Sequence, residues 1–317
     1  MDKRIPLIAV VGPTASGKTG LGIELAKRFN GEVVSADSMQ VYRELSIATA
    51  KPTKEEMQSI PHHMIDVASV CDEYSAAIYC ENAAAAIADI YNRGKLPILV
   101  GGTGLYVDSL ICGNDFSLQN SDRRVRERLC EEYDSLGGEV LLERLKACDE
   151  KAAQMCHINN KKRLVRYLEL YELTGLTADE RAQNLKKHTS PYDVLYFMPN
   201  CRDREHLYER INLRVDKMID DGLVNEVKNY YNTEGVKTAS QAIGCKELKP
   251  YLLGEATLSE CVEKLKQSTR RYAKRQLTWF LRNERLNILY SDEMSRSELL
   301  QAAFDKTEEF LQRGQDE

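Results

Sequence analysis

Short apolar runs alternate with stretches of helical spacing along the first hundred residues. Leu7 to Val11 is a continuous apolar run rich in β-branched residues, which predicts a buried strand. One face of a predicted helix after this strand carries Leu21, Leu25 and Phe29. An alanine-rich stretch predicts a helix at 76–92, and three more apolar runs predict strands at 32–36, 64–67 and 98–100. Because strands that alternate with helices pair in parallel, the pattern predicts an α/β fold, a parallel sheet flanked by helices.

The pattern changes at about residue 117, where charged, helix-forming sequence replaces the apolar runs until about residue 158. Strand-like sequence returns at 194–199 and at 286–290, with helical sequence between them and a polar terminal helix after Asp292. The sequence therefore predicts a core and an inserted helical subdomain, with the core at 1–116 and 159–317 and the insertion at 117–158.

Charge and composition exclude several classes of protein. The 317 residues carry 44 Lys and Arg against 49 Asp and Glu, so nucleic acid could bind only at local basic patches. Without a signal peptide or a run of about 18 apolar residues, the chain is expected to be cytoplasmic, with no membrane contact. The nine cysteines are too scattered to predict zinc binding or disulfides. His62 and His63 have no third ligand at usable spacing and are interpreted as structural.

A glycine-rich loop follows the first predicted strand. Residues 12–19, GPTASGKT, fit the pattern GxxxxGK[ST] and lie between a strand and a helix. The backbone N–H groups of such a loop converge on phosphate oxygens, Lys18 adds a positive charge, and Thr19 can hold Mg²⁺. The loop predicts a site for a di- or triphosphate.

The acidic residue that usually accompanies such a loop is absent from its usual place. In most proteins with this loop, a neighbouring apolar strand ends in an acidic residue that holds a metal ion. The best candidate for that strand here is followed by Gly101, Gly102 and Thr103 and has no carboxylate at its end. Asp37 instead follows the second predicted strand. This position suits a general base acting on an acceptor group beside the phosphates. The alternative interpretation is a helix cap or an ordinary loop residue.

Two basic segments stand out in the acidic chain, at 161–166 and 262–285. The second segment contains eight Lys or Arg against two Glu. On a helix, one face of this segment carries Arg271, Arg275 and Arg282. The packed face carries Leu265, Tyr272, Gln276 and Trp279. Two interpretations stay open for this basic ridge: an ordinary solvated helix surface, or a contact surface for an RNA-sized acceptor.

Several motifs, in order along nearly the whole chain, resemble the tRNA dimethylallyltransferases, also called isopentenyl-tRNA transferases. The motifs are GPTASGKT (12–19), ADSMQVY (36–42), TAKPT (49–53), LVGGTGLY (99–106), KRLVRYLE (162–169), RINLRVDKM (210–218), SQAIGCKE (240–247) and RRYAKRQLTWF (270–280). Ala48 and Cys245 depart from the Gly and Tyr that are usual in this family. The chain lacks the C-terminal zinc finger of the eukaryotic members, so the resemblance is to the bacterial type.

The resemblance implies a P-loop NTPase-like fold and a transferase that modifies tRNA. Such enzymes move a dimethylallyl group from dimethylallyl diphosphate to N6 of the adenosine at tRNA position 37, just 3′ of the anticodon. The reaction uses Mg²⁺ as cofactor and releases pyrophosphate. The expected partners are the anticodon stem-loop of tRNA and dimethylallyl diphosphate, and the expected state is a monomer.

The resemblance also implies roles for individual residues. Catalytic roles fall to Asp37, as the proton acceptor, and to Lys18, Thr19 and Thr103. Diphosphate binding falls to Gly12, Pro13, Thr14, Ala15, Ser16, Gly17, Lys18, Thr19, Arg210 and Arg214, and metal binding falls to Thr19. Contact with tRNA falls to Asp37, Ser38, Met39, Gln40, Thr103, Arg126, Lys162, Arg163, Arg166, Gln241, Lys246, Arg271 and Arg275.

Three other functions fit part of these motifs. A P-loop kinase for a small metabolite would use the loop and Asp37, but it leaves the basic helix and the insertion without a purpose. A prenyltransferase acting on free AMP would share the core motifs, but it would not need the RNA-facing segments. A nucleotide-gated RNA binder without catalysis would not need the motifs around Asp37 and Thr103.

Overall fold

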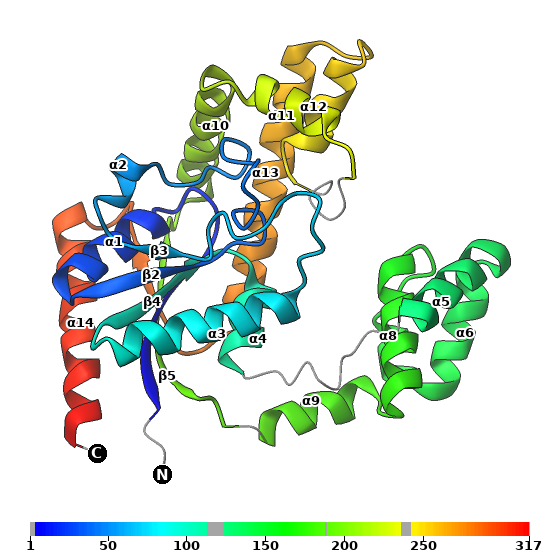
Figure 1. The fold of residues 1–317 in the computed structure, drawn as a ribbon, viewed down its shortest axis with the longest axis horizontal. Coiled ribbons are helices and arrows are strands. Elements are labelled where there is room, and N and C mark those ends of the chain that lie inside the picture. The colour runs from blue at the N-terminus through cyan, green and yellow to red at the C-terminus, as the bar shows by residue number, and fades with distance from the viewer. Residues whose placement is uncertain (1–3, 113–122, 188, 236–241, 317) are drawn as a thin grey trace. The chain divides into compact units, whose positions relative to one another are not determined.

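The computed structural model describes residues 4–112, 123–187, 189–235 and 242–316. Six parallel strands form one sheet in the order β3-β2-β4-β1-β5-β6 (Figure 1). The strands are β1 Ile5–Val11, β2 Gly31–Ala36, β3 His62–His63, β4 Leu96–Gly101, β5 Tyr192–Asn200 and β6 Leu286–Tyr290. The predicted α/β class is confirmed, and the glycine-rich loop follows the central strand β1, which pairs with β4 and β5.

Helices cover both faces of the sheet (Figure 1). One face is covered by α1 Lys18–Arg28 and α14 Arg296–Asp316, where the rings of Phe29 and Phe304 are 6.0 Å apart. The other face is covered by α3 Ala76–Asn92 and α4 Gly104–Ile111, where the rings of Tyr79 and Tyr106 stack at 4.0 Å. Helices therefore cover β1 on both sides. Because successive side chains point to opposite faces of the sheet, all seven residues of this strand form one continuous apolar run.

Four other helices that belong with the sheet lie beyond its carboxyl edge (Figure 1). They are α10 Arg204–Asp220, α11 Leu223–Asn232, α12 Cys245–Leu252 and α13 Leu258–Phe280, and the short α2 is Lys54–Met57. The long helix α13 packs against both α10 and α12.

Residues 111–190 form a second compact unit, separate from the unit of residues 1–110 and 191–317. Its helices are α5 Arg123–Leu136, α6 Gly138–Cys148, α7 Glu150–Gln154, α8 Lys161–Thr174 and α9 Ala178–Lys187. The unit extends beyond the insertion expected at 117–158, because Leu164 and Leu168 of α8 share a core with Leu129 of α5 and Leu145 of α6.

Most predicted elements of the core are present, and one is wrong. The helix predicted at 76–92 is α3, with the same bounds, and the strands predicted at 194–199 and 286–290 are β5 and β6. The strand predicted at 64–67 is absent, because Met64 and Asp66 have φ angles of 64° and 59°, which an extended strand does not allow. None of the helices in the described ranges has the length and apolar character needed to cross a bilayer.

Candidate active site at the carboxyl edge of the sheet

The loops after β1, β2 and β4 meet at one edge of the sheet, because the three strands are parallel neighbours. Together with α10, α12 and α13 they enclose a cavity of about 390 Å³. The cavity brings together residues from separate sequence motifs: Thr14, Lys18, Thr19, Asp37, Ser38, Met39, Gln40, Arg214, Lys246 and Arg275. The carboxyl edge of an open parallel sheet is where such folds bind ligands.

The phosphate loop follows a tight path from β1 into α1. Gly12 has a φ of 130°, and a Cβ there would lie 2.8 Å from Cγ of Met198, so the position requires glycine. Gly17, with a φ of 96°, starts α1 without a side-chain cap. Ser16 is buried, and its Oγ has no hydrogen-bond partner in the described part of the chain. Pro13 and Ala15 complete the loop, with Ala15 in the left-handed region.

Lys18 folds back over its own loop. Its Nζ donates a hydrogen bond to the carbonyl oxygen of Pro13 at 2.5 Å. Burial, and after it the positive charge of Arg214, lowers the pKa of Lys18 to about 7. A bound diphosphate would favour the protonated form, so this lysine is suited to neutralise an anion that enters the cavity.

Arg214 reaches the phosphate loop from α10. Its Nη1 donates to Oγ1 of Thr14 at 3.2 Å, and its Nη2 donates to the carbonyl oxygen of Ala50 at 3.4 Å. The guanidinium group therefore connects the loop after β1 with the segment that follows β2.

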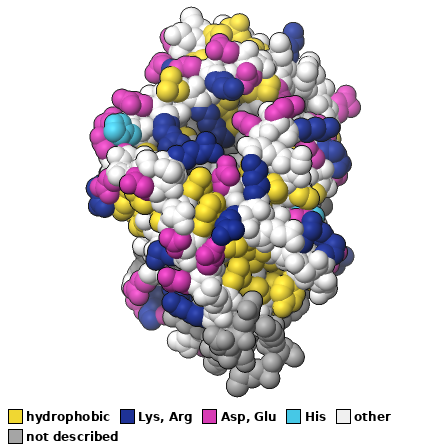
Figure 2. Space-filling view, turned by 90° about the vertical axis from the view of Figure 1, so that its left-hand side faces the viewer, with side chains coloured by type: hydrophobic (Ala, Val, Ile, Leu, Met, Phe, Trp, Pro, Cys, Tyr) yellow, Lys and Arg dark blue, Asp and Glu magenta, His cyan; other side chains and the backbone are white. Residues whose placement is uncertain are grey.

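Arg210 lies one helical turn before Arg214 but does not line the same cavity. Its Nη1 donates to Oγ of Ser291 at 3.3 Å, and its side chain lines a second cavity, also about 390 Å³, with Ser16 and Gly17 on the outer side of the loop. Figure 2 shows the side of the molecule with α1 and α14, where Lys and Arg side chains gather around a hollow. The structure thus brings Arg214, and not Arg210, into the main cavity.

Asp37 is held in one orientation directly after β2. Its Oδ1 accepts hydrogen bonds from the backbone N–H groups of Met39 at 2.9 Å and Gln40 at 3.3 Å. Its Oδ2 has no hydrogen-bond partner in the ranges that the structure describes. One carboxylate oxygen therefore serves the loop, and the other is available to a ligand in the cavity.

Ser38 and Thr103 join the wall beside Asp37 to the turn after β4. The backbone N–H of Ser38 donates to Oγ1 of Thr103 at 3.0 Å, and the backbone N–H of Thr103 donates to the carbonyl oxygen of Ala36 at 3.0 Å. The hydroxyl of Thr103 also lies 3.3 Å from that of Ser38. These bonds fix the distance between the loop after β2 and the turn after β4.

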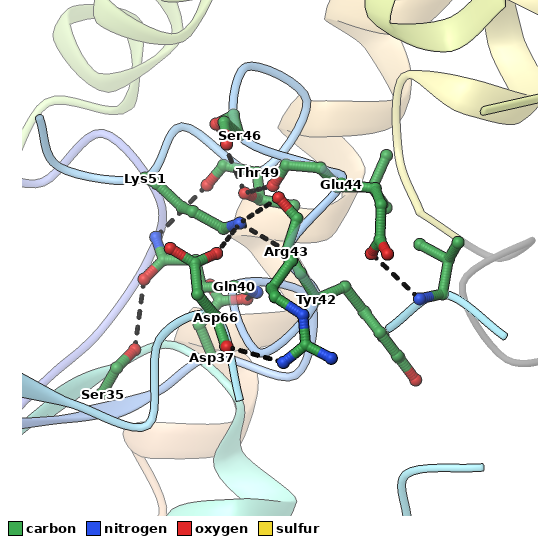
Figure 3. Close-up of polar contacts among 12 residues, drawn as sticks. Ser35, Asp37, Gln40, Tyr42, Arg43, Glu44, Ser46, Thr49, Lys51 and Asp66 are labelled. Carbon is green, nitrogen blue, oxygen red and sulfur yellow. Dashed lines mark hydrogen bonds and ion pairs between the residues drawn. The ribbon is translucent and has the colours of Figure 1, made fainter. Parts of the chain in front are cut away.

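The amide of Gln40 is engaged within the protein (Figure 3). Its Oε1 accepts from Oγ of Ser35 at 3.1 Å, and its Nε2 donates to the carbonyl oxygens of Thr49 at 3.3 Å and Ala50 at 3.4 Å. The contact between Gln40 and tRNA that the resemblance implies stays a prediction, and the structure gives this side chain a second role in holding the segment at 49–50.

Gln276 is a buried polar residue whose role the sequence did not reveal. Its Oε1 accepts from the backbone N–H of Thr14 at 2.8 Å, and its Nε2 donates to the carbonyl oxygen of Gly102 at 2.9 Å. The residue is 5% exposed. One amide on α13 therefore ties the phosphate loop to the turn after β4. The sequence signal was a glutamine on the packed face of a helix.

Tyr272 lies one turn before Gln276 and lines the cavity. Its hydroxyl lies near the carboxylate of Asp37 and beside the side chains of Thr103 and Gln276, and burial raises its pKa. The tyrosine is therefore a neutral group on the cavity wall.

The basic ridge of Arg271 and Arg275 on α13, with Arg282 just past the end of the helix, is exposed, and the exposed Lys274 lies beside it. Arg271, Lys274 and Arg275 are accessible to solvent and form no ion pair within the described residues. The guanidinium group of Arg275 lies 5.6 Å from the ring centroid of Tyr272, so the ridge borders the cavity mouth. Lys246, on α12, is also exposed, with its Nζ 3.6 Å from Oε1 of Glu247. The unpaired charges of Arg271, Lys274 and Arg275 in this position suit a polyanionic partner.

Four residues assigned to tRNA belong to the second unit: Arg126, Lys162, Arg163 and Arg166. There the fully buried Glu169 accepts from Nη2 of Arg126 at 2.9 Å and from Nη1 of Arg166 at 2.8 Å. Lys162 and Arg163 are exposed on α8. Gln241, also assigned to tRNA, lies outside the described residues.

The two histidines make different contacts. Nε2 of His63 lies 2.7 Å from Oε2 of the buried Glu32. Nδ1 of His62 lies 2.8 Å from the carbonyl oxygen of Ile60, and its ring lines the cavity, where burial lowers its pKa. Within the described ranges, no group of three His, Cys, Asp or Glu residues is arranged to hold a metal ion.

Known proteins match this chain over most of its length. A family model described as IPP transferase matches residues 40–284. The tRNA dimethylallyltransferase of Caldanaerobacter subterraneus is 49% identical over 282 residues, which cover 87% of this chain and 89% of that protein. The tRNA dimethylallyltransferase of Halalkalibacterium halodurans is 46% identical over 288 residues, 90% of each chain.

Solved structures match as well. The tRNA isopentenylpyrophosphate transferase from Bacillus halodurans gives a TM-score of 0.73 at 39% identity, with 98% of each chain covered. A eukaryotic dimethylallyltransferase acting on tRNA gives a TM-score of 0.83 at 30% identity, with 98% of this chain and 80% of that chain covered.

Proposed function

The chain belongs to the IPP transferase family, whose relatives above are tRNA dimethylallyltransferases, and we propose that it prenylates tRNA. The donor is dimethylallyl diphosphate, and the acceptor is N6 of the adenosine at tRNA position 37. The nitrogen attacks the first prenyl carbon, the C–O bond breaks, and pyrophosphate leaves with the electron pair. One observation carries the proposal: a single cavity holds a phosphate loop on one wall and a carboxylate with an available oxygen on another.

The phosphate-loop side suits a leaving pyrophosphate. Lys18 and Arg214 bring positive charge to the cavity wall, and negative charge develops on the leaving group as the C–O bond breaks. Stabilising this charge more in the transition state than in the ground state accelerates the reaction. Arg210 lines the second cavity, so its contact with the diphosphate stays a prediction.

The residues present fit the Mg²⁺ expected for such a reaction. Mg²⁺ prefers oxygen ligands and usually takes only one or two of them from the protein, with the others from phosphates and water. Thr19 supplies a hydroxyl oxygen on the cavity wall. When bound, the ion would offset negative charge on the diphosphate.

Asp37 is the residue that takes the proton from N6. The exocyclic amine of adenine is a weak nucleophile, because its lone pair is delocalised into the ring, so removal of a proton during bond formation assists attack. The fixed orientation of Asp37 supports this role, since the loop engages Oδ1 and leaves Oδ2 for an incoming group. The target base must leave the stack of the anticodon loop to enter the cavity.

The exposed charges of Arg271, Lys274 and Arg275 beside the cavity favour an RNA acceptor over a free nucleotide. A small metabolite kinase or an AMP prenyltransferase would leave this unpaired charge beside the cavity without a purpose, and the relatives give neither alternative any support. The monomeric state stays a prediction.

One experiment tests the proposal directly. The protein is incubated with labelled dimethylallyl diphosphate and, in separate reactions, with unmodified tRNA, AMP, or tRNA whose position 37 is guanosine. Label should enter only the tRNA with adenosine at position 37. Label in AMP, or none in any acceptor, contradicts the proposed function. Labelled ATP replaces the prenyl donor in a parallel reaction to test for kinase activity.

Asp37→Asn isolates the proton-accepting role. Oδ1 of asparagine still accepts from Met39 and Gln40, so the wall of the cavity stays in place, while the basic oxygen is lost. We expect the single-turnover rate to fall by about 10²- to 10⁴-fold, with tRNA affinity nearly unchanged in a filter-binding assay. A variant that reacts at the wild-type rate would remove Asp37 from the mechanism.

A further inference from the structure

Glu226, on α11, grips a segment that is distant in sequence. Its Oε2 accepts from the backbone N–H groups of Ser46 and Ile47, each at 2.8 Å, and its Oε1 accepts from that of Ala48 at 2.7 Å. Three successive N–H groups that point at one carboxylate form an anion-binding concavity, and hydrogen bonds to a charged acceptor are about twice as strong as neutral ones. The contact is thus strong enough to fix the segment.

The gripped segment forms a wall of the cavity. Ala48, Thr49 and Ala50 all line it. Ala50 has a φ of 43°, a conformation that a residue with a Cβ adopts only when its surroundings hold it there. Bonds at both ends supply that constraint, with Glu226 before Ala50 and Gln40 beside it. Figure 3 shows Thr49 above Gln40.

The carbonyl oxygen of Ala50 connects this wall to Arg214, the arginine assigned to the leaving pyrophosphate. It accepts from Nη2 of Arg214 at 3.4 Å, while Nη1 of the same guanidinium group donates to Thr14 of the phosphate loop. A bond of that length is sensitive to small movements of the acceptor. If the segment moves, Arg214 loses one of the two contacts that aim it.

We propose that Glu226 is a positioning residue for prenyl transfer, one that holds residues 46–50 so that Ala50 aims Arg214 at the diphosphate. This inference rests on the proposed function above. Glu226 itself does not line the cavity; it acts through the segment and the arginine.

The chain contains a matched control in Glu44. Its Oε2 accepts from the backbone N–H of Val70 at 3.0 Å, and its Oε1 accepts from Oγ of Ser69 at 2.8 Å. Glu44 thus holds the loop at Ser69 and Val70 by hydrogen bonds to a carboxylate, as Glu226 holds residues 46–48. Glu44, Ser69 and Val70 do not line the cavity. A merely structural role for Glu226 would make Glu226→Gln and Glu44→Gln behave alike.

The experiment compares the two variants with wild type in three measurements: the urea midpoint of unfolding, the affinity for pyrophosphate by calorimetry, and kcat and KM for prenylation of tRNA. We expect both variants to lower the midpoint. Glu226→Gln alone should weaken pyrophosphate about tenfold, the effect of weakening one charge-assisted hydrogen bond. It should also lower kcat and raise KM for dimethylallyl diphosphate, while KM for tRNA stays within about twofold.

Glu226→Asp provides the second variant if the glutamine variant does not fold. It keeps the charge with a shorter reach, so it should recover part of the pyrophosphate affinity. Wild-type pyrophosphate affinity and kcat in a folded Glu226 variant, with a lowered midpoint equal to that of Glu44→Gln, would overturn the proposal. Because pyrophosphate binding does not require transfer, a wild-type protein that binds pyrophosphate but prenylates nothing contradicts the proposed function instead.

Discussion

Replacing Gln276 by Met tests whether the cavity depends on one buried amide. Methionine is unbranched and close to glutamine in length, so it keeps the packing of α13 and removes only the two hydrogen bonds. The carbonyl oxygen of Gly102 then has no partner in a buried position. Thr14 lines the cavity, where water can replace the lost partner of its N–H.

The magnitude follows from these two environments. A buried polar group left unpaired costs about 1–3 kcal/mol. We assign the whole of this cost to Gly102 and about half of it to Thr14. The variant should therefore lower the free energy of unfolding by about 1.5–4.5 kcal/mol.

Trp279 gives a local readout of this change. It is the only tryptophan of the chain, and it lies one turn after Gln276, with its Nε1 donating to Oδ2 of Asp108 at 2.8 Å. Its fluorescence during urea unfolding reports the unit that contains α13 and not the second unit. Asn287→Ala is the control, because the Asn287 side chain donates to the carbonyl oxygen of Tyr196 on β5, outside the cavity.

Pyrophosphate affinity distinguishes a tie between loops from ordinary packing. We expect Gln276→Met to weaken pyrophosphate by about tenfold, because the phosphate loop loses its anchor, and Asn287→Ala to leave the affinity unchanged. A loss of stability below about 0.5 kcal/mol, which is typical of a surface position, together with wild-type pyrophosphate affinity would refute the reasoning.

Two further predictions concern charge. Burial and Arg214 lower the pKa of Lys18 to about 7, so between pH 7 and 10.5 the unfolded chain binds more protons, and the stability of the free protein should rise with pH across this window. Lys18→Met should raise the urea midpoint at pH 7 and flatten this rise; a midpoint at or below wild type at pH 7 contradicts the shift. Replacing Arg271 and Arg275 together by Gln should weaken tRNA binding and reduce the slope of log K against log salt by about 1.4 to 1.8, the value for two phosphate contacts. An unchanged slope in a variant with wild-type melting temperature would mean that the ridge is ordinary surface.

The local parts of the fold could be predicted from the sequence. The strand at β1, the phosphate loop and the start of α1 are specified by a continuous apolar run, by glycines at positions of positive φ, and by the apolar spacing after them. The position of Asp37 after β2 follows from the same local reasoning. Parallel neighbours then bring the loops together, which is why the cavity lies where the motifs predict.

Contacts between distant segments could not be predicted in this way. The strand expected at 64–67 has the right composition but includes residues that the surrounding loops hold at positive φ. Similarly, the helical spacing of Arg210 and Arg214 predicts one face of a helix. The two side chains nevertheless line different cavities, because different residues of the phosphate loop lie beside each of them. The second unit extends past residue 158 because α8 fills a core that α5 and α6 leave incomplete.

The cavity owes its shape to polar side chains that the C-terminal helices place on loops near the N-terminus. Gln276 holds Thr14 and Gly102, Arg214 holds Thr14 and Ala50, and Glu226 holds the segment before Ala50. The partners in these bonds are separated by about 160 to 260 residues, so no local sequence pattern predicts the bonds. Their arrangement also has an energetic consequence. Because the loops and the helices share these bonds, ligand binding at the phosphate loop is coupled to the packing of α10 and α13. The coupling free energy is reciprocal: the packed helices strengthen ligand binding by the same amount by which the bound ligand stabilises their packing.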